Sequence, residues 1–496
     1  MPEVEPRKTE RPLILTLDAG TSWVRAAVHD ALARPVKGWN ARRRHPTVVT
    51  AEGGVEQDAE GSLALVTDVI DDVLAQSGLQ AGDIAAVSMA VLASSLVGVD
   101  AADRPVTPLY LYSDTRPAAE VDTLRQRLDP RRVHQRTGCP IHTSYLPARL
   151  LWLALREPAL NAASRRWLAL PDFVYRRFFG RATSSFSIAS WSGLLDHAAL
   201  NWDYELLEIL QADPKRLTPI AEEPLEGLSE PYATRWPVLK TVPWFPAYAD
   251  GVASNIGSGC ADEGTVAMSL STTAALRAVT GASERELPPA LWRYRVDSRR
   301  PLLGGATNEG GGVMRWLART LNTAHGVDEA AASVAPDSHG LTVLPFLTGE
   351  RSPGWQSQLR GTVAGLSPNT QPADIVRAFM ESSAYRLAHV AAAMTDYGLT
   401  PERIRANGGA AARYPTWLQI IADVLGVTIE VSGEREATSR GAAVLALERL
   451  GHRDLPPAAV SEQLFLPDPD RTAIYDEAIR RQSSLYARLV DWFEPE

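Results

Sequence analysis

The chain has 496 residues, 45% of them hydrophobic and 22% charged, which is ordinary for a soluble globular protein but too long for one compact core. Its formal net charge is −9, so it lacks the basic excess by which proteins attract nucleic acid or anionic membranes. We therefore expect a small metabolite as the partner, and neither nucleic acid nor a membrane.

The cysteines and the N-terminus indicate the compartment. Only Cys139 and Cys260 are present, which excludes a disulfide framework and favours a reducing environment. No run of about 18 apolar residues occurs, so no membrane span is expected. Residues 1–12 mix charge with proline and lack the apolar core of a signal peptide. We expect a cytoplasmic protein that begins with a frayed tail.

The N-terminal half begins with a hairpin pattern. Residues 13–18 (LILTLD) predict a buried strand, and residues 23–30 (WVRAAVHD) predict a second strand after a glycine-containing turn. The stretch 84–100 is apolar and rich in β-branched and small residues. From 141 to 210 the apolar positions recur three and four residues apart, which predicts helices.

A proline-rich segment at 213–248 is typical of a connector, and we place a domain boundary near residue 250. The predicted domains are residues 1–250 and 251–496. The second domain repeats the opening theme, because residues 268–279 again place hydroxyls between two apolar strands. Long helices are expected later, at 371–397 and 414–425. The repeat has two alternative explanations, which are duplication of one ancestral unit and a chance similarity between two β-hairpins.

The turn at residues 18–22 is the first candidate chemical site. Gly20 permits a tight turn whose N–H groups, with the hydroxyls of Thr21 and Ser22, can surround phosphate oxygens. Asp18 ends the strand and can hold a hydrated Mg²⁺ that bridges those oxygens. The simpler alternative is a hairpin turn capped by an Asp side chain.

The second half offers further phosphate and nucleotide contacts. The turn formed by Ser271, Thr272 and Thr273 supplies hydroxyls and N–H groups. Glycine-rich segments at 304–312 and 408–414 each precede a helix, where a flat ligand can approach the backbone and the helix N-terminus favours anions. Close packing of a helix on a sheet explains the same glycines. Neither segment has the Rossmann or P-loop spacing.

Asp250 and Asp114 are candidates for deprotonating or binding a hydroxyl group of the substrate. Asp250, followed by Gly251, is placed at the predicted domain junction, which suits a general base. Asp114 and Arg116 can bind vicinal hydroxyls or an acid. A turn and a surface ion pair are the respective alternatives. The nine histidines lack metal-ligand spacing, so a protein-built transition-metal site is not expected.

In this order the motifs resemble the FGGY carbohydrate kinases of the actin/hexokinase/Hsp70 superfamily, over about residues 13–450. The most specific segment is 349–387 (GERSPGWQSQLRGTVAGLSPNTQPADIVRAFMESSAYRL), joined by 55–60 (VEQDAE), 304–312 (GGATNEGGG) and 438–447 (TSRGAAVLAL). The resemblance implies an α/β fold of two ribonuclease H-like domains around a central cleft. It also implies ATP and Mg²⁺ as cofactors and a sugar or sugar acid as substrate.

The resemblance also implies residue roles. Asp250 corresponds to the catalytic base that deprotonates the acceptor hydroxyl, and Asp18 lies near magnesium, through water. The expected phosphate and nucleotide contacts are Asp18, Gly20, Thr21, Ser22, Arg25, Thr272, Thr273, Gly311, Arg315, Gly409 and Arg413. The expected acceptor contacts are Ser94, Tyr112, Asp114, Arg116, Asp250 and Gly251, so the first domain mainly binds the sugar and the second mainly binds the nucleotide.

Segments 88–117, 137–153 and 187–196 look most like gluconate kinases, so gluconate is the expected acceptor. Three positions depart from that pattern. Ala93, Ser94 and Ser95 replace a usual Met-His-Ser, which removes a histidine that faces the substrate. Tyr112 replaces a tryptophan, and Ser271 replaces a glycine of the second phosphate turn.

Other functions fit the same sequence. A xylulose-type ketose kinase or polyol kinase would differ in the pocket built by 93–95, 112–116 and 141–145. A catalytically silent relative would bind nucleotide and sugar without transferring phosphate. An actin- or Hsp70-type ATPase is disfavoured by the 349–387 segment. Family members are often dimers, so a homodimer is a further expectation.

Overall fold

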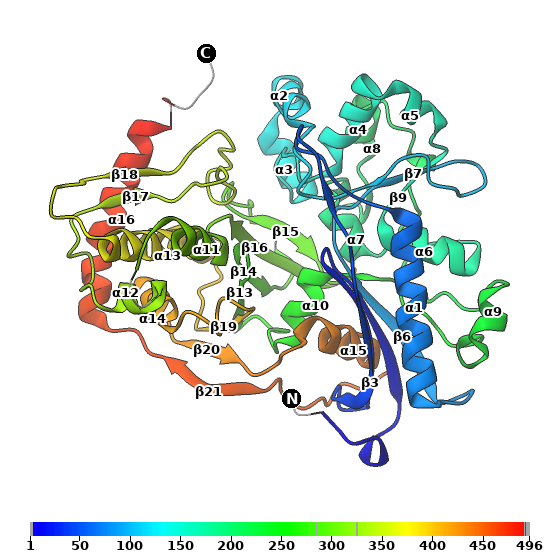
Figure 1. Cartoon of the computed structure of the whole chain (residues 1–496). Helices are drawn as coiled ribbons and strands as arrows, with labels where there is room; N and C mark the ends of the chain where they lie inside the picture. The colour runs from blue at the N-terminus through cyan, green and yellow to red at the C-terminus, as the bar shows by residue number, and fades with distance from the viewer. Residues whose placement is uncertain (1–2, 284, 324–325, 491, 493–496) are drawn as a thin grey trace. The chain divides into compact units, whose positions relative to one another are not determined.

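The protein is described here from a computed structural model that covers residues 3–283, 285–323, 326–490 and 492. Its α/β fold divides into two compact units (Figure 1). The first contains the described residues up to Gly259, with Arg293–Leu302 and Arg435–Ala458. The second contains Cys260–Trp292, Leu303–Glu434 and the residues described from Ala459 onward. The units therefore do not follow the expected single cut near residue 250.

The first unit is built on a five-stranded sheet in the order β12–β6–β1–β2–β3. Its strands are β1 (Leu13–Ala19), β2 (Trp23–His29), β3 (Pro35–Arg44), β6 (Ile84–Val91) and β12 (Tyr248–Ala249). β1 is antiparallel to β2 and parallel to β6, and β12 is parallel to β6. Every residue of β1 is buried, as expected of a central strand. The predicted N-terminal hairpin is confirmed.

Helices cover both faces of this sheet. Figure 1 shows α1 (Ala59–Ser77) along one side and α15 (Ala437–Arg449) along the other. α15 packs against β1, β6 and α10 (Asp250–Gly257). The crossing of α10 and α15 is close, because a Cβ atom on Gly257 would lie 1.8 Å from the Ala437 carbonyl oxygen, and one on Gly441 would lie 1.8 Å from that of Ala253. This packing explains why a segment near residue 440 belongs to the first unit.

Shorter elements complete the first unit. They are η1 (Pro6–Lys8), β4 (Val48–Val49), β5 (Val55–Gln57), β7 (Val97–Val99), β8 (Leu109–Tyr110), α2 (Ala118–Arg127), α3 (Pro130–Thr137), α4 (Leu146–Arg156), α5 (Pro158–Ala163), β9 (Arg166–Leu168), α6 (Leu170–Phe179), α7 (Phe186–Trp191), β10 (Leu195–Asp196), β11 (Asn201–Trp202), α8 (Tyr204–Ile209), η2 (Pro214–Arg216), α9 (Tyr232–Arg235) and η3 (Pro237–Leu239). The helices predicted between 141 and 210 are present.

Two expectations for the first unit are wrong. The opening segment is not frayed over its described part, because the Val4 N–H donates to the Pro35 carbonyl and Val4 bridges to Val36 in parallel. The segment 213–248 is more than a connector, because Trp236 and Trp244 are buried in the core. In both cases contacts distant in sequence order a stretch whose composition is typical of loops.

The second unit contains most of a seven-stranded sheet in the order β15–β16–β14–β13–β19–β20–β21, of which Arg293–Arg295 of β15 and Pro301–Leu302 of β16 are counted with the first unit. The strands are β13 (Thr265–Leu270), β14 (Ala274–Val279), β15 (Trp292–Arg295), β16 (Pro301–Thr307), β19 (Arg403–Asn407), β20 (Ile429–Ser432) and β21 (Val460–Phe465). β13 is antiparallel to β14 and parallel to β19, and β20 is parallel to β19. The order β16–β14–β13–β19–β20 thus matches β3–β2–β1–β6–β12, which supports duplication of one unit.

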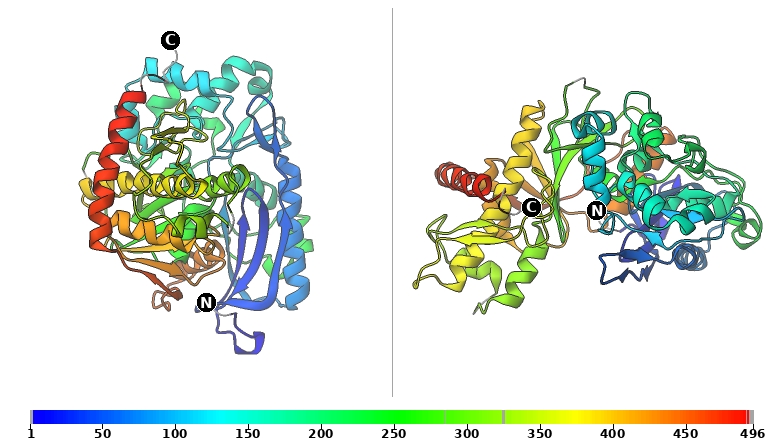
Figure 2. Two further views of the ribbon diagram at one scale, coloured as in Figure 1. Left: turned by 60° about the vertical axis from the view of Figure 1, so that its left-hand side comes forward. Right: turned by 90° about the horizontal axis from the view of Figure 1, so that it is seen from above.

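The remaining elements of the second unit are α11 (Gly311–Thr320), α12 (Val327–Ala332), β17 (Thr342–Leu344), β18 (Thr362–Ala364), α13 (Pro372–Asp396), α14 (Pro415–Leu425) and α16 (Pro469–Leu489). The long helices predicted at 371–397 and 414–425 are confirmed by α13 and α14. Figure 2 shows α16 crossing over α13 at the outside of the unit. No helix in the described part of the chain is both long and apolar enough to cross a membrane.

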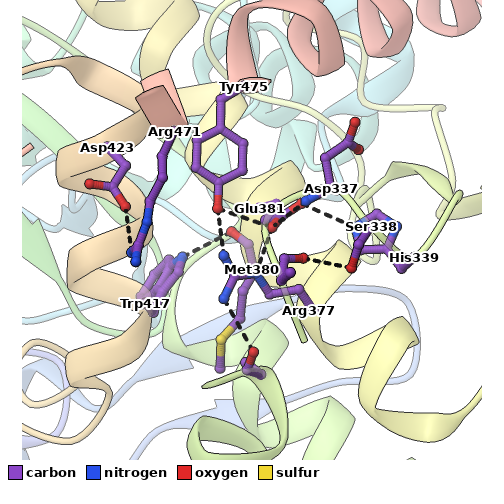
Figure 3. Close-up of polar contacts among 12 residues, drawn as sticks. Asp337, Ser338, His339, Arg377, Met380, Glu381, Trp417, Asp423, Arg471 and Tyr475 are labelled. Atoms are coloured by element: carbon purple, nitrogen blue, oxygen red, sulfur yellow. Dashed lines mark hydrogen bonds and ion pairs between the residues drawn. The ribbon is translucent and has the colours of Figure 1, made fainter. Parts of the chain in front are cut away.

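A buried polar network links α13 to α16 (Figure 3). The Glu381 carboxylate accepts hydrogen bonds from Arg377 at 2.5 Å, from the Tyr475 hydroxyl at 3.1 Å and from His339 Nε2 at 3.0 Å. Burial alone would raise the pKa of Glu381, but the hydrogen bond from His339 and the charge of Arg377 hold it below its ordinary value. The carboxylate is fully used within the fold, so this cluster is a structural network.

Candidate active site

Three parallel strands of the first unit end at one edge of its sheet. β1, β6 and β12 are paired in matching register up to their carboxyl ends. The turn 20–22, the segment 93–95 and Asp250 follow these three strands. Because ligands bind outside the carboxyl ends of parallel strands in open α/β sheets, this edge is the candidate site of the first unit.

The turn after β1 is held by side chains from the neighbouring strands. His45 Nδ1 lies 2.8 Å from the Gly20 carbonyl oxygen and must carry the proton, because a carbonyl only accepts. The His45 N–H donates to the Ser22 carbonyl at 2.9 Å, and Gln57 Nε2 donates to the Thr21 carbonyl at 2.9 Å. With these carbonyls fixed, the N–H groups of Thr21 and Ser22 have no partner among the described residues and can receive the oxygens of an anion.

Asp18, Arg25 and Asp250 form one electrostatic group. Arg25 Nη1 donates to Asp18 Oδ2 at 2.9 Å. Burial raises the pKa of Asp18 to about 6, the charge of Arg25 opposes the rise, and the charge of Asp250 adds to it. Two mutually repelling carboxylates beside an anion-binding turn form a site that a hard divalent cation would stabilise.

Asp250 is the first residue of α10 and is half-buried. Its Oδ1 accepts a hydrogen bond from the Gly251 N–H at 2.7 Å. The N-terminus of a helix favours a negative charge, so the position suits an ionised carboxylate. The alternative of a simple Asp-Gly turn is wrong, because both residues belong to the first turn of the helix.

Ser94 is placed by a buried arginine. Its backbone is left-handed, with φ of 55°, its hydroxyl donates to the Trp191 carbonyl, and its side chain is buried. Arg149 is fully buried and donates to the carbonyls of Ser94 (3.2 Å), Leu111 (2.7 Å) and Thr143 (3.4 Å). Burial lowers the pKa of Arg149 to about 10, so it remains charged at neutral pH. One guanidinium thus joins the expected acceptor segments 93–95 and 141–145 to Leu111, which directly precedes the third segment, 112–116.

Asp114 and Arg116 are paired with each other. Arg116 donates to Asp114 Oδ1 at 3.1 Å and Oδ2 at 2.5 Å, and to Glu56 at 2.6 Å. Its guanidinium carbon also lies 4.9 Å from the centre of the Trp152 ring. Asp114 is buried, whereas Tyr112 is 39% exposed. The pair is therefore a partly buried charged cluster and not a surface ion pair.

In the second unit, the turn 271–273 lies against the start of α11. The Ser271 N–H donates to the Thr273 carbonyl at 2.9 Å. The N–H groups of Gly311 and Gly312 donate to the carbonyls of Ser271 (2.7 Å) and Thr272 (3.0 Å). The sequence-based expectation that the N-terminus of this helix attracts an anion is therefore wrong for these two groups, because the turn already uses them.

Other predicted nucleotide contacts lie around the same turn. Arg315 Nη2 donates to Thr272 Oγ1 at 3.0 Å. The Ala410 N–H donates to the carbonyl at the end of β13, at 3.1 Å. Gly409 and Arg413 are exposed in the loop that contains Ala410. Gly311 lies between turn and loop, since a Cβ there would be 2.9 Å from the Ala410 Cβ.

Glu309 lies buried just before α11, and its two carboxyl oxygens have no hydrogen-bond partner in another described residue. Burial raises the pKa of Glu309 to about 8. The negative charge of Glu350 adds to this rise, and the positive charge of Arg386 opposes it. An uncharged carboxyl group is therefore favoured at neutral pH.

The predicted residues thus form two groups, each described within its own unit. Asp18, Arg25 and Asp250 interact in the first, and Thr272 and Arg315 in the second. Residues not assigned a role from sequence are His45, Gln57, Arg149 and Glu309. Gln57 and Glu309 lie in quoted family motifs, which is the only signal that pointed to them. His45 and Arg149 act through backbone carbonyls of distant segments, and no local pattern marks such contacts.

The chain matches the FGGY family of carbohydrate kinases, in its N-terminal domain over residues 13–257 and in its C-terminal domain over residues 266–448. A gluconokinase of Bacillus subtilis (strain 168) is 27% identical over 387 residues, which is 75% of each chain. A glycerol kinase of Gloeobacter violaceus is 31% identical over 449 residues, which is 87% of each chain. A gluconate kinase structure from Lactobacillus acidophilus aligns with a TM-score of 0.89 at 24% identity, covering 96% of this chain and 98% of that one. This last likeness shows the fold.

Proposed function

Because the chain belongs to the FGGY family of carbohydrate kinases, we propose that it transfers the γ-phosphate of ATP to a hydroxyl of a sugar acid, with gluconate as the best candidate. The observation that carries this proposal is the edge of the first sheet. There the buried Asp18 lies near the end of β1, a turn with two free N–H groups follows that strand, and Asp250 follows β12, with β6 between the two parallel strands. Kinase activity itself follows from the family.

Asp250 is the proposed general base. Its carboxylate would take the proton of the acceptor hydroxyl as that oxygen attacks the γ-phosphorus. The bond between the γ-phosphorus and the bridging oxygen then breaks, and ADP leaves with the bonding electrons. Its place at the start of α10 favours the negative charge of the carboxylate that accepts the proton.

Asp18 is proposed to hold Mg²⁺ through water, and the repulsion between Asp18 and Asp250 fits a cation at this place. When bound, Mg²⁺ screens the phosphate charges. The N–H groups of Thr21 and Ser22 bind phosphate oxygens and orient them. In the second unit we assign the same task to Thr272, Thr273 and Arg315, and adenosine contacts to Gly311, Gly409 and Arg413.

Gluconate is favoured by the gluconokinase relative and by the segments that resemble gluconate kinases. A ketose or polyol acceptor is the second candidate. It is favoured by the higher identity to a glycerol kinase over more of the chain, and by Ala93 and Ser94 at the place of the expected Met-His pair. The pocket joined by Arg149 would decide between these acceptors.

A coupled ADP-release assay tests the proposal, with ATP and Mg²⁺ against gluconate, other sugar acids, xylulose and glycerol, and with a blank lacking acceptor. We expect acceptor-dependent ADP release that is fastest with gluconate. Faster release with xylulose or glycerol would move the protein to the second candidate. Binding of ATP without ADP release from any acceptor would overturn the proposal in favour of a silent relative.

A further inference from the structure

A second pocket opens on the first unit, on elements that carry none of the proposed site residues. It has a volume of about 760 Å³ and lies among β9, α6, β11, α8 and the segment 214–220. A volume of this size matches known small-molecule pockets, which span about 300–1,000 Å³. No residue that lines it belongs to the predicted acceptor or nucleotide contacts.

The pocket is strongly basic. Arg166, Arg176, Arg181 and Lys215 line it, and none of the described lining residues is acidic. Three of these cations come from basic doublets that are far apart in sequence, at 165–166, 176–177 and 215–216. The pocket is thus locally basic in a chain whose formal net charge is −9.

Few of these charges are neutralised within the fold. Arg166 and Arg176 share one carboxylate, Asp103, at 3.4 Å and 2.6 Å. Arg181 contacts only a backbone carbonyl, at 3.5 Å, and the Lys215 ammonium contacts no described residue. Arg181 and Lys215 are exposed, so their donors are available to a ligand.

Two aromatic side chains in the rest of the pocket wall can contact the uncharged part of an organic ligand. Trp202 is almost buried, and its indole N–H is already used by the Thr218 carbonyl at 3.0 Å, so the ring contributes apolar surface. Tyr204 is 55% exposed at the rim, where a ring or a sugar face can lie against it.

We propose that this pocket binds a small phosphorylated metabolite carrying two or more negative charges. Arg181 and Lys215 would bind the phosphate, with Arg176 supplying the guanidinium nitrogens that Asp103 does not use. Such an anion has two sources, a phosphorylated sugar acid or the phosphates of a nucleotide. The site is separate from the proposed kinase chemistry, and it stands even if the acceptor there is not gluconate.

The test uses isothermal titration calorimetry on the full chain, with 6-phosphogluconate, ADP and pyrophosphate as separate probes. The variant is R181E/K215E, which reverses two exposed charges without touching the proposed kinase site. The matched control is K240E/R299E, which makes the same change of charge at exposed positions of the same unit outside the pocket. ADP-release kinetics of all three proteins are measured alongside.

Because 6-phosphogluconate and ADP are also products of the proposed reaction, we expect the wild type to show a second binding event besides that at the proposed kinase site. This second event should weaken about tenfold or more in R181E/K215E and be retained in K240E/R299E. ADP-release kinetics without added probe should stay unchanged in both. Loss of the second event for 6-phosphogluconate alone would identify a sugar phosphate, and loss of the second event for ADP alone would identify a nucleotide. Equal binding in wild type and R181E/K215E, equal weakening in both variants, or no second binding event in the wild type would each overturn the proposal.

Discussion

Arg149 shows how a single buried side chain can shape a pocket that it does not line. Its guanidinium donates to three backbone carbonyls, two within the expected acceptor segments 93–95 and 141–145 and one at Leu111, directly before the segment 112–116. A carbonyl buried without its donor costs about 1–3 kcal/mol, so the three segments depend on this residue for their relative positions. Arg149 is a positioning residue, because it is fully buried behind them.

We predict that Arg149→Met raises the KM for the acceptor by about tenfold or more and leaves the KM for ATP within about twofold. Arg149→Lys should restore part of the loss, because an ammonium group keeps the charge but reaches fewer carbonyls. Steady-state kinetics with each substrate varied in turn would measure both constants. An equal rise in the two KM values would show general destabilisation and contradict the positioning role.

The buried Glu309 should make the free energy of unfolding depend on pH. Its pKa is raised to about 8 in the folded chain, against about 4.3 in the unfolded chain. Between these values the folded state holds a proton that the unfolded state has lost. The free energy of unfolding therefore falls as pH rises through this range, by about 1.4 kcal/mol per pH unit for one proton.

The variant Glu309→Gln cannot ionise and should lack this decline. Urea unfolding of the wild type and of the variant, at pH values from 5 to 9, should show a difference in stability that grows up to about pH 8 and then levels off. Parallel stability curves would show that Glu309 is ionised in the folded chain.

At the scale of elements, the crossing of α10 and α15 controls the placement of the proposed base. Asp250 begins α10, and Gly441 lets α15 approach that helix until no space remains for a Cβ atom. We predict that Gly441→Ala lowers the free energy of unfolding by about 1–3 kcal/mol and lowers kcat more than it changes the KM for ATP. Urea unfolding and steady-state kinetics would test both effects.

The matched control for this change is Gly264→Ala, because a Cβ there meets no atom within 4 Å. This control should stay within about 0.5 kcal/mol of the wild type. A Gly441→Ala variant as stable and active as the control would show that the two helices can separate without disturbing Asp250.

The sequence predicted those elements whose signal is local. The hairpin at 13–30 and the helices α13 and α14 follow from alternation and from 3.6-residue periodicity. It did not reveal that the start of α11 is bonded to the turn 271–273, because that contact joins segments about 40 residues apart. For the same reason, the buried tryptophans of 213–248 were hidden within a loop-like composition.

At the scale of the molecule, the common strand order of the two sheets was only suggested by two short hairpins. The order became visible once the pairing of β1 with β6, and of β13 with β19, was known. The candidate site was largely predictable, since Asp18 and Asp250 were marked by motif and resemblance. The supporting residues His45 and Arg149 were not, because their partners are backbone atoms of other segments. A cytoplasmic location, a homodimer and a central cleft stay predictions.

The central claim is that Asp250 serves as the base for transfer of phosphate from ATP to a sugar acid. Phosphorus NMR of ATP and Mg²⁺ with gluconate, in the presence of wild type or Asp250→Asn, tests it most directly. We expect a phosphate monoester signal and ADP to appear together with the wild type. The variant should give neither, while still binding ATP nearly as tightly. Monoester formation by the variant at the wild-type rate would contradict the role of Asp250, and its absence with the wild type would contradict transfer of phosphate to gluconate.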